Sequence, residues 1–532
     1  MMARGSRQRY VTFLLILLPL AFFVCSGCLK VGPDYVRPEV KVADTWLEAA
    51  DARLKTDPAA TRRWWQAFRD PVLDQLIEKA YRENLDLRQA GVRVLEAQAQ
   101  LGIAVGRFFP QTQEVTGSAQ RARTGAGTPF PIGGGTGPKF AGFNYWQAQL
   151  GLNLAWELDF WGKFRRAIES ADAGLEASVA NYDAALVSLT ANVAALYTTI
   201  RTLEHRLAIA RNNVATQQES LAIAEARFAG GVTSQRDVEQ SRSQLTATQS
   251  IIPVLQTQLR QAQDALCVLL GQPPQHLPEL AQGRGQIPRP PLQVAAGIPA
   301  ELLRRRPDIR AAEYNAMAQC ALIGVAKADL LPAFSLTGNF GFQASDVGRN
   351  SLADFADWPN RFGSVGPSVR WPILNYGRLT NLVRVQDARF QELLLQYQNT
   401  VLKAQQEVED NLAAFLRGQE QVRFLTESVA ASQKSLDLAV IQYREGITDF
   451  TTVLTAQQAL LRTQESLAEA QGAIATSLVG VYRALGGGWE LREGQELIPA
   501  ALQEEMGKRT SWGTMLKQGL GKREEGKEKE GQ

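Results

Sequence analysis

The chain contains few of the residues from which catalytic or metal sites are built. Its 532 residues include 2 histidines and 4 cysteines, and neither His205 nor His276 has a partner at the spacing of metal ligands. The formal net charge is +3, so the basic excess typical of nucleic-acid binding is missing as well. We therefore predict a protein that is not an enzyme, holds no cofactor or metal, and does not bind nucleic acid.

Long hydrophobic runs are also missing, apart from one near the N-terminus. Arg4, Arg7 and Arg9 precede an uncharged apolar run over residues 11–24, which is shorter than the roughly 20 residues that a membrane-spanning helix needs. This layout predicts a secretory signal peptide over residues 1–27. If the mature chain spans a membrane, it must then do so with strands.

The cysteines divide into two groups. Cys28 follows Ser26 and Gly27, a pattern that resembles the lipobox of bacterial lipoproteins and predicts lipid attachment, including palmitate, at Cys28. Ordinary cleavage without acylation is the alternative. Cys267 and Cys320 lie on different expected helices, where buried free thiols are favoured over a disulfide.

The sequence contains an internal repeat. When it is shifted by 215 residues, Trp156 and Gly162 fall on Trp371 and Gly377, and the pair Leu270-Gly271 falls on Leu485-Gly486. An internal duplication of this kind implies two similar structural units in one chain.

Each repeat carries two very long helical patterns. In the first repeat, apolar residues keep an alternating three-four spacing over residues 186–228 and again, after Gly230 and Gly231, over 238–269. This spacing is a heptad seam, and two helices joined by a short glycine turn run antiparallel. The second repeat shows the same register over 401–443 and 453–481. Simple helix pairs and a packed tube of helices are both compatible with these seams.

Segments with strict apolar–polar alternation lie between the helical patterns. They cover residues 150–158, 334–343 and 364–373, and a weaker candidate covers 113–123, so each repeat contributes one β-hairpin. Four strands cannot close a membrane barrel, which needs at least about eight. Several chains must then share one barrel; a small soluble sheet packed on the helices is the alternative.

Three motifs, in this order, resemble a known family. They are Val31-Gly32-Pro33-Asp34-Tyr35, the run from Arg305 to Glu313, and Ala484-Leu485-Gly486-Gly487-Gly488-Trp489. The chain resembles the TolC/OprM-type outer-membrane efflux channels, in their NodT-like lipoprotein branch.

The resemblance implies a mostly α fold with a membrane β part. Long antiparallel helical hairpins would form a trimeric α-helical tunnel, and four strands per chain would complete a shared twelve-stranded β-barrel. The expected organisation is an acylated N-terminal segment and belt at 28–70, a first structural repeat at 71–285, a second at 286–490, and a belt remnant with a disordered charged tail at 491–532. Within the repeats we expect β-hairpins at about 112–158 and 333–373 and helical hairpins at 162–271 and 377–486.

The function implied by the resemblance is the outer-membrane channel of a tripartite efflux system. The channel would be a homotrimer, held in outer-membrane lipid, that receives substrate from an inner-membrane pump of the RND type through a periplasmic adaptor protein. A lipid-anchored coiled-coil spacer or adhesin is the alternative, and its helices would need no lumen.

The resemblance also places functional residues at the two helix turns. Adaptor contacts are expected at Gly230, Gly231, Val232, Glu445, Gly446 and Ile447, although the glycines would be needed to reverse the chain in any case. The periplasmic gate is expected at Tyr443, Asp449, Thr452 and Thr455. Family members carry aspartates at the last two positions, so we expect a constriction here without its acidic ring. Tyr443 can equally be the last residue of the heptad seam.

Overall fold

The structure is a computed structural model of the full chain, and it describes residues 29–55, 61–123, 125, 129–132, 135–139, 142–301, 305–347 and 351–516. The predicted signal peptide, Cys28 and the charged tail at 522–532 lie outside these residues. Helices dominate the described part and strands make up a smaller share, which confirms the prediction of a mostly α chain with a β part. The chain divides into two compact units, the first formed by residues 1–37, 97–175 and 314–394 and the second by the remainder.

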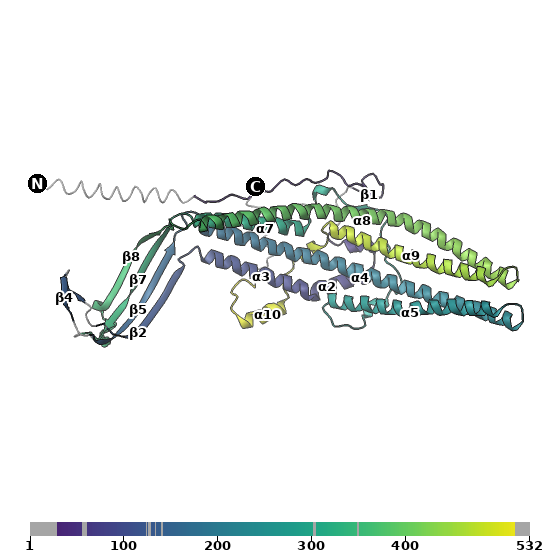
Figure 1. The fold of residues 1–532 in the computed structure, drawn as a ribbon, viewed down its shortest axis with the longest axis horizontal. Coiled ribbons are helices and arrows are strands. Elements are labelled where there is room, and N and C mark those ends of the chain that lie inside the picture. Colours follow the sequence, from purple (N-terminus) through teal and green to yellow (C-terminus); the bar gives the residue numbers. More distant parts are fainter. Residues whose placement is uncertain are drawn as a thin grey trace. The chain divides into compact units, whose positions relative to one another are not determined.

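The first unit contains a four-stranded antiparallel sheet in the order β2-β5-β7-β8, and these strands lie side by side (Figure 1). Their bounds are Thr112–Arg123 for β2, Asn144–Glu157 for β5, Ala333–Ser345 for β7 and Arg361–Arg370 for β8. Leu152 of β5 stands opposite Val115 on one side and Phe340 on the other. Because side chains alternate along each strand, this register gathers the apolar residues on one face and the polar residues on the other.

Residues 124–144 are rich in glycine and proline and predict a loop between β2 and β5, but the connection is not a plain loop. It contains a second strand pair, β3 (Pro129–Ile132) with β4 (Gly135–Lys139), whose register shifts between Pro129 and Pro131. Proline has no backbone N–H to give to a ladder, which accounts for an irregular pair at this point.

The N-terminal segment of the first unit is held by a buried arginine. The guanidinium of Arg166 is 1% exposed; its Nε donates to the carbonyl of Val31 (3.2 Å) and its Nη2 to the carboxylate of Asp34 (2.8 Å). This arginine lowers the pKa of Asp34 through hydrogen bonding and charge. A Cβ on Gly324 would stand 2.7 Å from the Val31 carbonyl oxygen, so the close approach requires glycine there. The segment that follows Cys28 is therefore fixed in place.

Two helical hairpins enter the second unit, and within each the helices run antiparallel (Figure 1). The first joins α4 (Lys163–Ala229) to α5 (Gln235–Leu269), and the second joins α8 (Arg378–Arg444) to α9 (Phe450–Ala484). Seam residues such as Leu186, Val193 and Ile200 are fully buried, as heptad spacing requires. Part of α4 is long and apolar enough to span a membrane by composition, but 61% of that stretch is buried inside the protein.

Polar contacts and small residues join the two hairpins in the second unit. The side chain of Gln457 on α9 donates to Ser220 on α4 (2.7 Å), and Asn213 on α4 donates to Gln464 on α9 (2.8 Å). A Cβ on Gly472 would lie 2.3 Å from Thr202 Oγ1, so glycine lets α9 approach α4 closely. The hairpins therefore pack through matched polar pairs as well as apolar seams.

The shorter helices differ from the sequence predictions. The sequence predicts a single shorter helix over residues 72–105, but the chain forms α2 (Pro71–Glu83) and α3 (Leu85–Gly106), separated at Asn84. The Asn84 side chain accepts from the backbone N–H of Leu87 and donates to the Leu269 carbonyl, which starts a new helix at this residue. The sequence also predicts a helix over residues 299–330; of that range the structure describes a short 3-10 turn, Pro299–Glu301, and α7 (Pro307–Ala328).

The segment after the second repeat, predicted as a belt remnant, contains regular secondary structure. It contains the 3-10 turn η6 (Trp489–Arg492) and α10 (Ala500–Arg509). Met506 of α10 and Ile498 pack against Leu95 of α3 in a separate hydrophobic cluster. Arg492 forms an ion pair with Asp183 of α4, and both side chains are buried. A short parallel pair joins β1 (Leu54–Lys55) to β6 (Val294–Ala295).

Candidate functional site at the ends of the helical hairpins

The turn between α4 and α5 is closed by backbone hydrogen bonds. Gly231 N–H donates to the Phe228 carbonyl (2.9 Å) and Val232 N–H to the Arg227 carbonyl (2.9 Å). Gly231 has φ +69°, whereas no heavy atom would lie within 4 Å of a Cβ there. Conformation, and not space, therefore explains glycine at this position.

The turn between α8 and α9 repeats this pattern residue for residue. Gly446 N–H donates to the Tyr443 carbonyl (3.1 Å), Ile447 N–H donates to the Gln442 carbonyl (2.9 Å), and Gly446 has φ +74°. At the matching position of each turn an apolar side chain stands in solvent: Val232 is 65% exposed and Ile447 is 74% exposed. Each hairpin therefore ends in a rigid turn that presents one large apolar residue.

The acidic residues of the two turns occupy different helix-capping positions. Asp449 is the N-cap of α9; its carboxylate accepts from the Thr452 backbone N–H (3.3 Å) and hydroxyl (3.2 Å). In the first turn the acid is Asp237, one helical turn further along, where it is buried and accepts from the hydroxyls of Thr233 and Ser234. A carboxylate at either position stabilises the positive end of the helix dipole.

The structure places the four predicted gate residues near one another along the chain, but in different environments. Thr452 and Thr455 are exposed, and the Thr455 hydroxyl donates to the Thr451 carbonyl of its own helix (2.8 Å). Tyr443 is 4% exposed and packs edge-on against Phe450, with ring centroids 5.4 Å apart. Tyr443 thus lies in the core cluster at the end of the second hairpin.

The expected last seam residue of the first repeat, Phe228, is not part of that core. Its side chain is 44% exposed, which corrects the seam predicted from heptad spacing. The neighbouring Arg227 takes the inward position instead: its guanidinium lies 4.7 Å from the centroid of the Tyr443 ring. The stacked cation thus covers one face of the Tyr443 ring.

Arg227 also bonds the first hairpin to the second. Its Nη1 donates to the carbonyls of Tyr443 (2.6 Å) and Arg444 (3.0 Å), the last residues of α8. Both carbonyls lie at the end of α8, where that of Tyr443 also accepts from Gly446 N–H (3.1 Å). The cation adds to this contact and complements the negative helix end. The repeat-equivalent residue is Gln442, which carries no charge. Sequence reasoning missed this contact because Arg227 lies off the seam.

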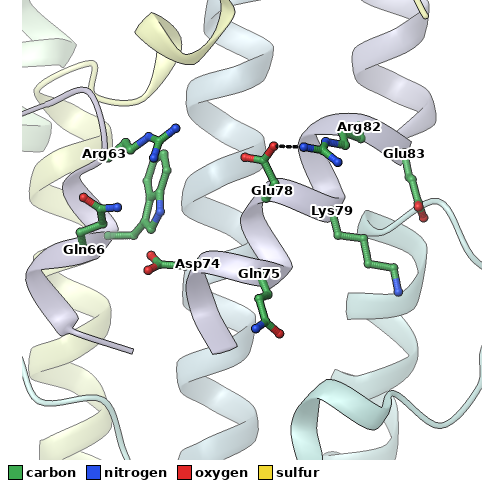
Figure 2. Close-up of a pocket in the computed structure, with 9 residues that line it drawn as sticks. Arg63, Gln66, Asp74, Gln75, Glu78, Lys79, Arg82 and Glu83 are labelled. Carbon is green, nitrogen blue, oxygen red and sulfur yellow. Dashed lines mark hydrogen bonds and ion pairs between the residues drawn. The ribbon is translucent and has the colours of Figure 1, made fainter. Parts of the chain in front are cut away.

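No second site with reactive chemistry stands out in the described residues. A hollow of about 460 Å³ over α2 is lined by charged side chains, but Figure 2 shows Glu78 and Arg82 paired with each other (2.7 Å). Burial, together with the nearby Asp70, raises the pKa of Asp74 at its edge. The lining contains no histidine, cysteine or hydroxyl residue, and no group of three metal-ligating side chains was found in the described part of the chain.

Comparison with known proteins assigns the fold and these turns to a family. The family model described as "Outer membrane efflux protein" matches residues 76–272 and 298–487. The pyoverdine export outer membrane protein OpmQ of Pseudomonas putida is 34% identical over 90% of this chain and 97% of its own length. Nodulation protein T of Rhizobium leguminosarum bv. trifolii is 30% identical over 88% and 97%. A Salmonella typhimurium relative, "Probable outer membrane lipoprotein SilC", is 28% identical over 88% and 97%.

Solved structures show the same architecture. The outer-membrane channel OprN aligns with a TM-score of 0.79 at 34% identity, covering 87% of this chain and all of that one. The Campylobacter jejuni CmeC outer membrane channel has the same fold, with a TM-score of 0.80 at 23% identity, 89% of this chain and 100% of that one being covered.

The chain therefore belongs to the outer membrane efflux protein family, and it is the outer-membrane duct of an efflux system. The predicted family, the efflux function and the lipid-anchored outer-membrane location are confirmed. The alternative of a structural spacer or adhesin is not favoured. Attachment of lipid at Cys28 itself stays a prediction.

Proposed function

We propose that three copies of the chain form a passive exit duct, with their sheets closed into one twelve-stranded barrel and their helical hairpins arranged as a tunnel. The observation that carries this proposal is the amphipathic four-stranded sheet with two open edges.

One face of the sheet is suited to lipid. Leu150, Leu152 and Leu154 of β5 are each at least 40% exposed, and Phe340 and Val365 on the neighbouring strands are exposed on the same face. The opposite face carries residues such as Thr116, Asn153, Asn339 and Ser364. An apolar outer band with a polar interior is the pattern of a membrane barrel that surrounds water.

The edges of the sheet favour closure by further copies. β2 and β8 each have one neighbour in this sheet, which leaves a row of backbone donors and acceptors on each strand. Such groups cannot stay unpaired in lipid. Because β2 and β8 run in opposite directions, β8 of one copy can pair with β2 of the next in the antiparallel order used throughout the sheet.

The hairpin tips support the proposed adaptor contact. Gly230, Gly231 and Val232, with Glu445, Gly446 and Ile447, form two matching turns whose exposed apolar residues suit the tip of a partner helix pair. The partner is a periplasmic adaptor that connects the duct to an inner-membrane pump of the RND type. The cargo is chosen by the pump, since the described residues offer no selective site at the tips.

The gate is proposed at the same end. Tyr443, Asp449, Thr452 and Thr455 lie beside the turn, and Arg227 ties the end of α8 to the first hairpin. Asp449 is engaged in capping its helix, so the constriction relies on the position of the helix ends and not on a ring of free carboxylates. Opening then requires the Arg227 contacts to break when the adaptor docks.

Drug export in cells with the matching adaptor and pump tests this proposal. Val232→Lys combined with Ile447→Lys changes two exposed side chains without a cavity, so trimers are expected at normal levels while drug accumulation rises to that of cells lacking the chain. The matched control is Val254→Lys, at an exposed valine within α5; cells with this variant should export the drug normally. Unchanged export by the tip variant would contradict the adaptor contact. Lipid attachment is tested separately: Cys28→Ser should abolish labelling by radioactive palmitate.

A further inference from the structure

The two repeats make several contacts inside the chain at the junction between the sheet and the helices, among them an ion pair of Lys163 with Asp329 (3.0 Å). After β5, the indole N–H of Trp161 donates to the carbonyl of Pro332, just before β7 (2.8 Å). The neighbouring Phe160 packs edge-on against Phe334, with centroids 5.4 Å apart. The segment that leaves the sheet after β5 in repeat one therefore packs against the segment that leads into β7 in repeat two.

A second pair of contacts shows that the repeats are equivalent at this junction. Trp156 Nε1 donates to the Phe108 carbonyl (3.2 Å), and Trp371 Nε1 donates to the Leu330 carbonyl (3.1 Å). Trp371 is the repeat equivalent of Trp156, so by these contacts Phe108 corresponds to Leu330 and, two residues on, Pro110 corresponds to Pro332, one residue from the offset that the strands keep. By the same shift of 215 residues, Trp161 corresponds to Tyr376.

The equivalents of the contacting residues lie at the two edges of the sheet, where the Pro110 carbonyl accepts from the exposed side chain of Gln113 (3.1 Å). Tyr376 is 97% exposed and Leu374 is 83% exposed at the β8 edge. Phe109, next to Pro110 at the β2 edge, is 57% exposed. Tyr376 also has φ +50°, a strained conformation for a residue other than glycine. These are the two halves of the contact that Trp161 and Pro332 complete in the middle of the sheet.

We propose that the junction at Tyr376 of one copy packs on the Phe109–Pro110 junction of a second copy, in the arrangement that Trp161 makes with Pro332. The inference rests on the proposed ring of copies and adds the partner, the contact and the register. A second copy is favoured over lipid because both halves are already present in each chain, on opposite edges, and because the internal copy of the contact is occupied.

Repeat equivalence also fixes how the strands pair. Val115 stands opposite Leu152, and Leu336 stands opposite Pro367. Because Pro367 is the repeat equivalent of Leu152, Leu336 is the equivalent of Val115. Within the chain, Leu150 of β5 stands opposite Phe342 of β7. The equivalents of these two residues are Val365 of β8 and Arg121 of β2, so the proposed pairing sets Val365 of one copy opposite Arg121 of the next. Apolar-face positions then meet apolar-face positions across the new pair.

The charges of the two edges agree with this register. Arg370 at the end of β8 and Glu114 at the start of β2 are both exposed, and no ion pair is found for either among the described residues. Both lie on the polar face of their strands. In the proposed register Arg370 stands opposite Thr116 of the second copy and diagonal to Glu114, within reach of a long side chain.

Disulfide trapping in outer-membrane fractions tests the register. Val365→Cys combined with Arg121→Cys should give a covalent ladder of dimers and trimers on boiled, non-reducing gels. Leu150→Cys with Phe342→Cys is the matched internal pair and should link within one chain, without a ladder. Val365→Cys with Ala119→Cys is shifted by two residues and should link several-fold less.

Trimers that form normally but link best through Ala119, or not at all, would overturn the inference while leaving the proposed function intact. Absence of any trimer in the unmodified chain would instead remove the proposed function. A second readout keeps the junction testable: Tyr376→Ala should lower the temperature at which trimers dissociate, and Tyr376→Trp should restore it. Equal dissociation temperatures for Tyr376→Ala and the unmodified chain would also contradict the contact.

Discussion

Replacing Arg227 by alanine should loosen the closed end of the duct. The side chain donates two hydrogen bonds to helix-terminal carbonyls and covers the Tyr443 ring. Hydrogen bonds of a charged group contribute about 1.5–3 kcal/mol each, and a cation over a ring about 0.5–2 kcal/mol. Because Arg227 is only half-buried, we expect on the order of 3 kcal/mol per chain in total, or roughly a 100-fold shift toward the open form.

The assay is the open probability of purified protein in planar bilayers, supported by uptake of a large antibiotic that the intact outer membrane excludes. Tyr443→Phe is the control, because the Tyr443 hydroxyl is buried without a hydrogen-bond partner while its ring does the packing. We expect Arg227→Ala to raise both readouts and Tyr443→Phe to leave them unchanged. Equal readouts for Arg227→Ala and the unmodified chain, at equal trimer levels, would refute the reasoning.

Three further predictions concern the fold that supports the tips. Asp183→Ala leaves buried Arg492 without its ion-pair partner and should destabilise the protein by about 3–5 kcal/mol, seen as a lower unfolding temperature. Lys508→Ala, which breaks the exposed pair with Glu504, should change the unfolding temperature little. Equal shifts in the two variants would contradict the burial argument. Arg166→Ala should release the N-terminal segment, so that trypsin cuts after Lys30 much faster; unchanged cleavage would count against the clamp. Hydrogen bonds from Arg53 lower the pKa of Asp51 from 3.8 to about 2. The stabilisation that the Asp51 carboxylate gives is therefore complete above about pH 4 and is lost as the pH falls toward 2. Pepsin cleavage near residue 51 should follow that window, and the same profile in Asp51→Asn would disprove the assignment.

The long helices and the main strands could be predicted because their signals are periodic and local. Heptad spacing and the turns at Gly231 and Gly446 indicate α4, α5, α8 and α9, and strict alternation indicates β5 and β7. A break such as that at Asn84 depends on one side chain that bonds to a distant carbonyl, Leu269, which no pattern reveals. α10 was missed because its apolar residues are few.

The candidate site was predicted in position but not in its contacts. The glycine turns are visible in the sequence, and the shift of 215 residues identifies them as equivalent. Arg227 could not be found in this way, because its role comes from the packing of one hairpin on the other and the second repeat has Gln442 in its place. Phe228 shows the same limit: heptad spacing alone assigns it inward, whereas its side chain is 44% exposed and Arg227 lies over the Tyr443 ring.

Ion conductance of the purified chain in a planar lipid bilayer tests most directly whether the sheets of several copies surround water. We predict discrete conductance steps, small for the unmodified chain and larger for Arg227→Ala. A chain that inserts into the bilayer as a trimer and yet never conducts, with or without Arg227, would contradict the duct.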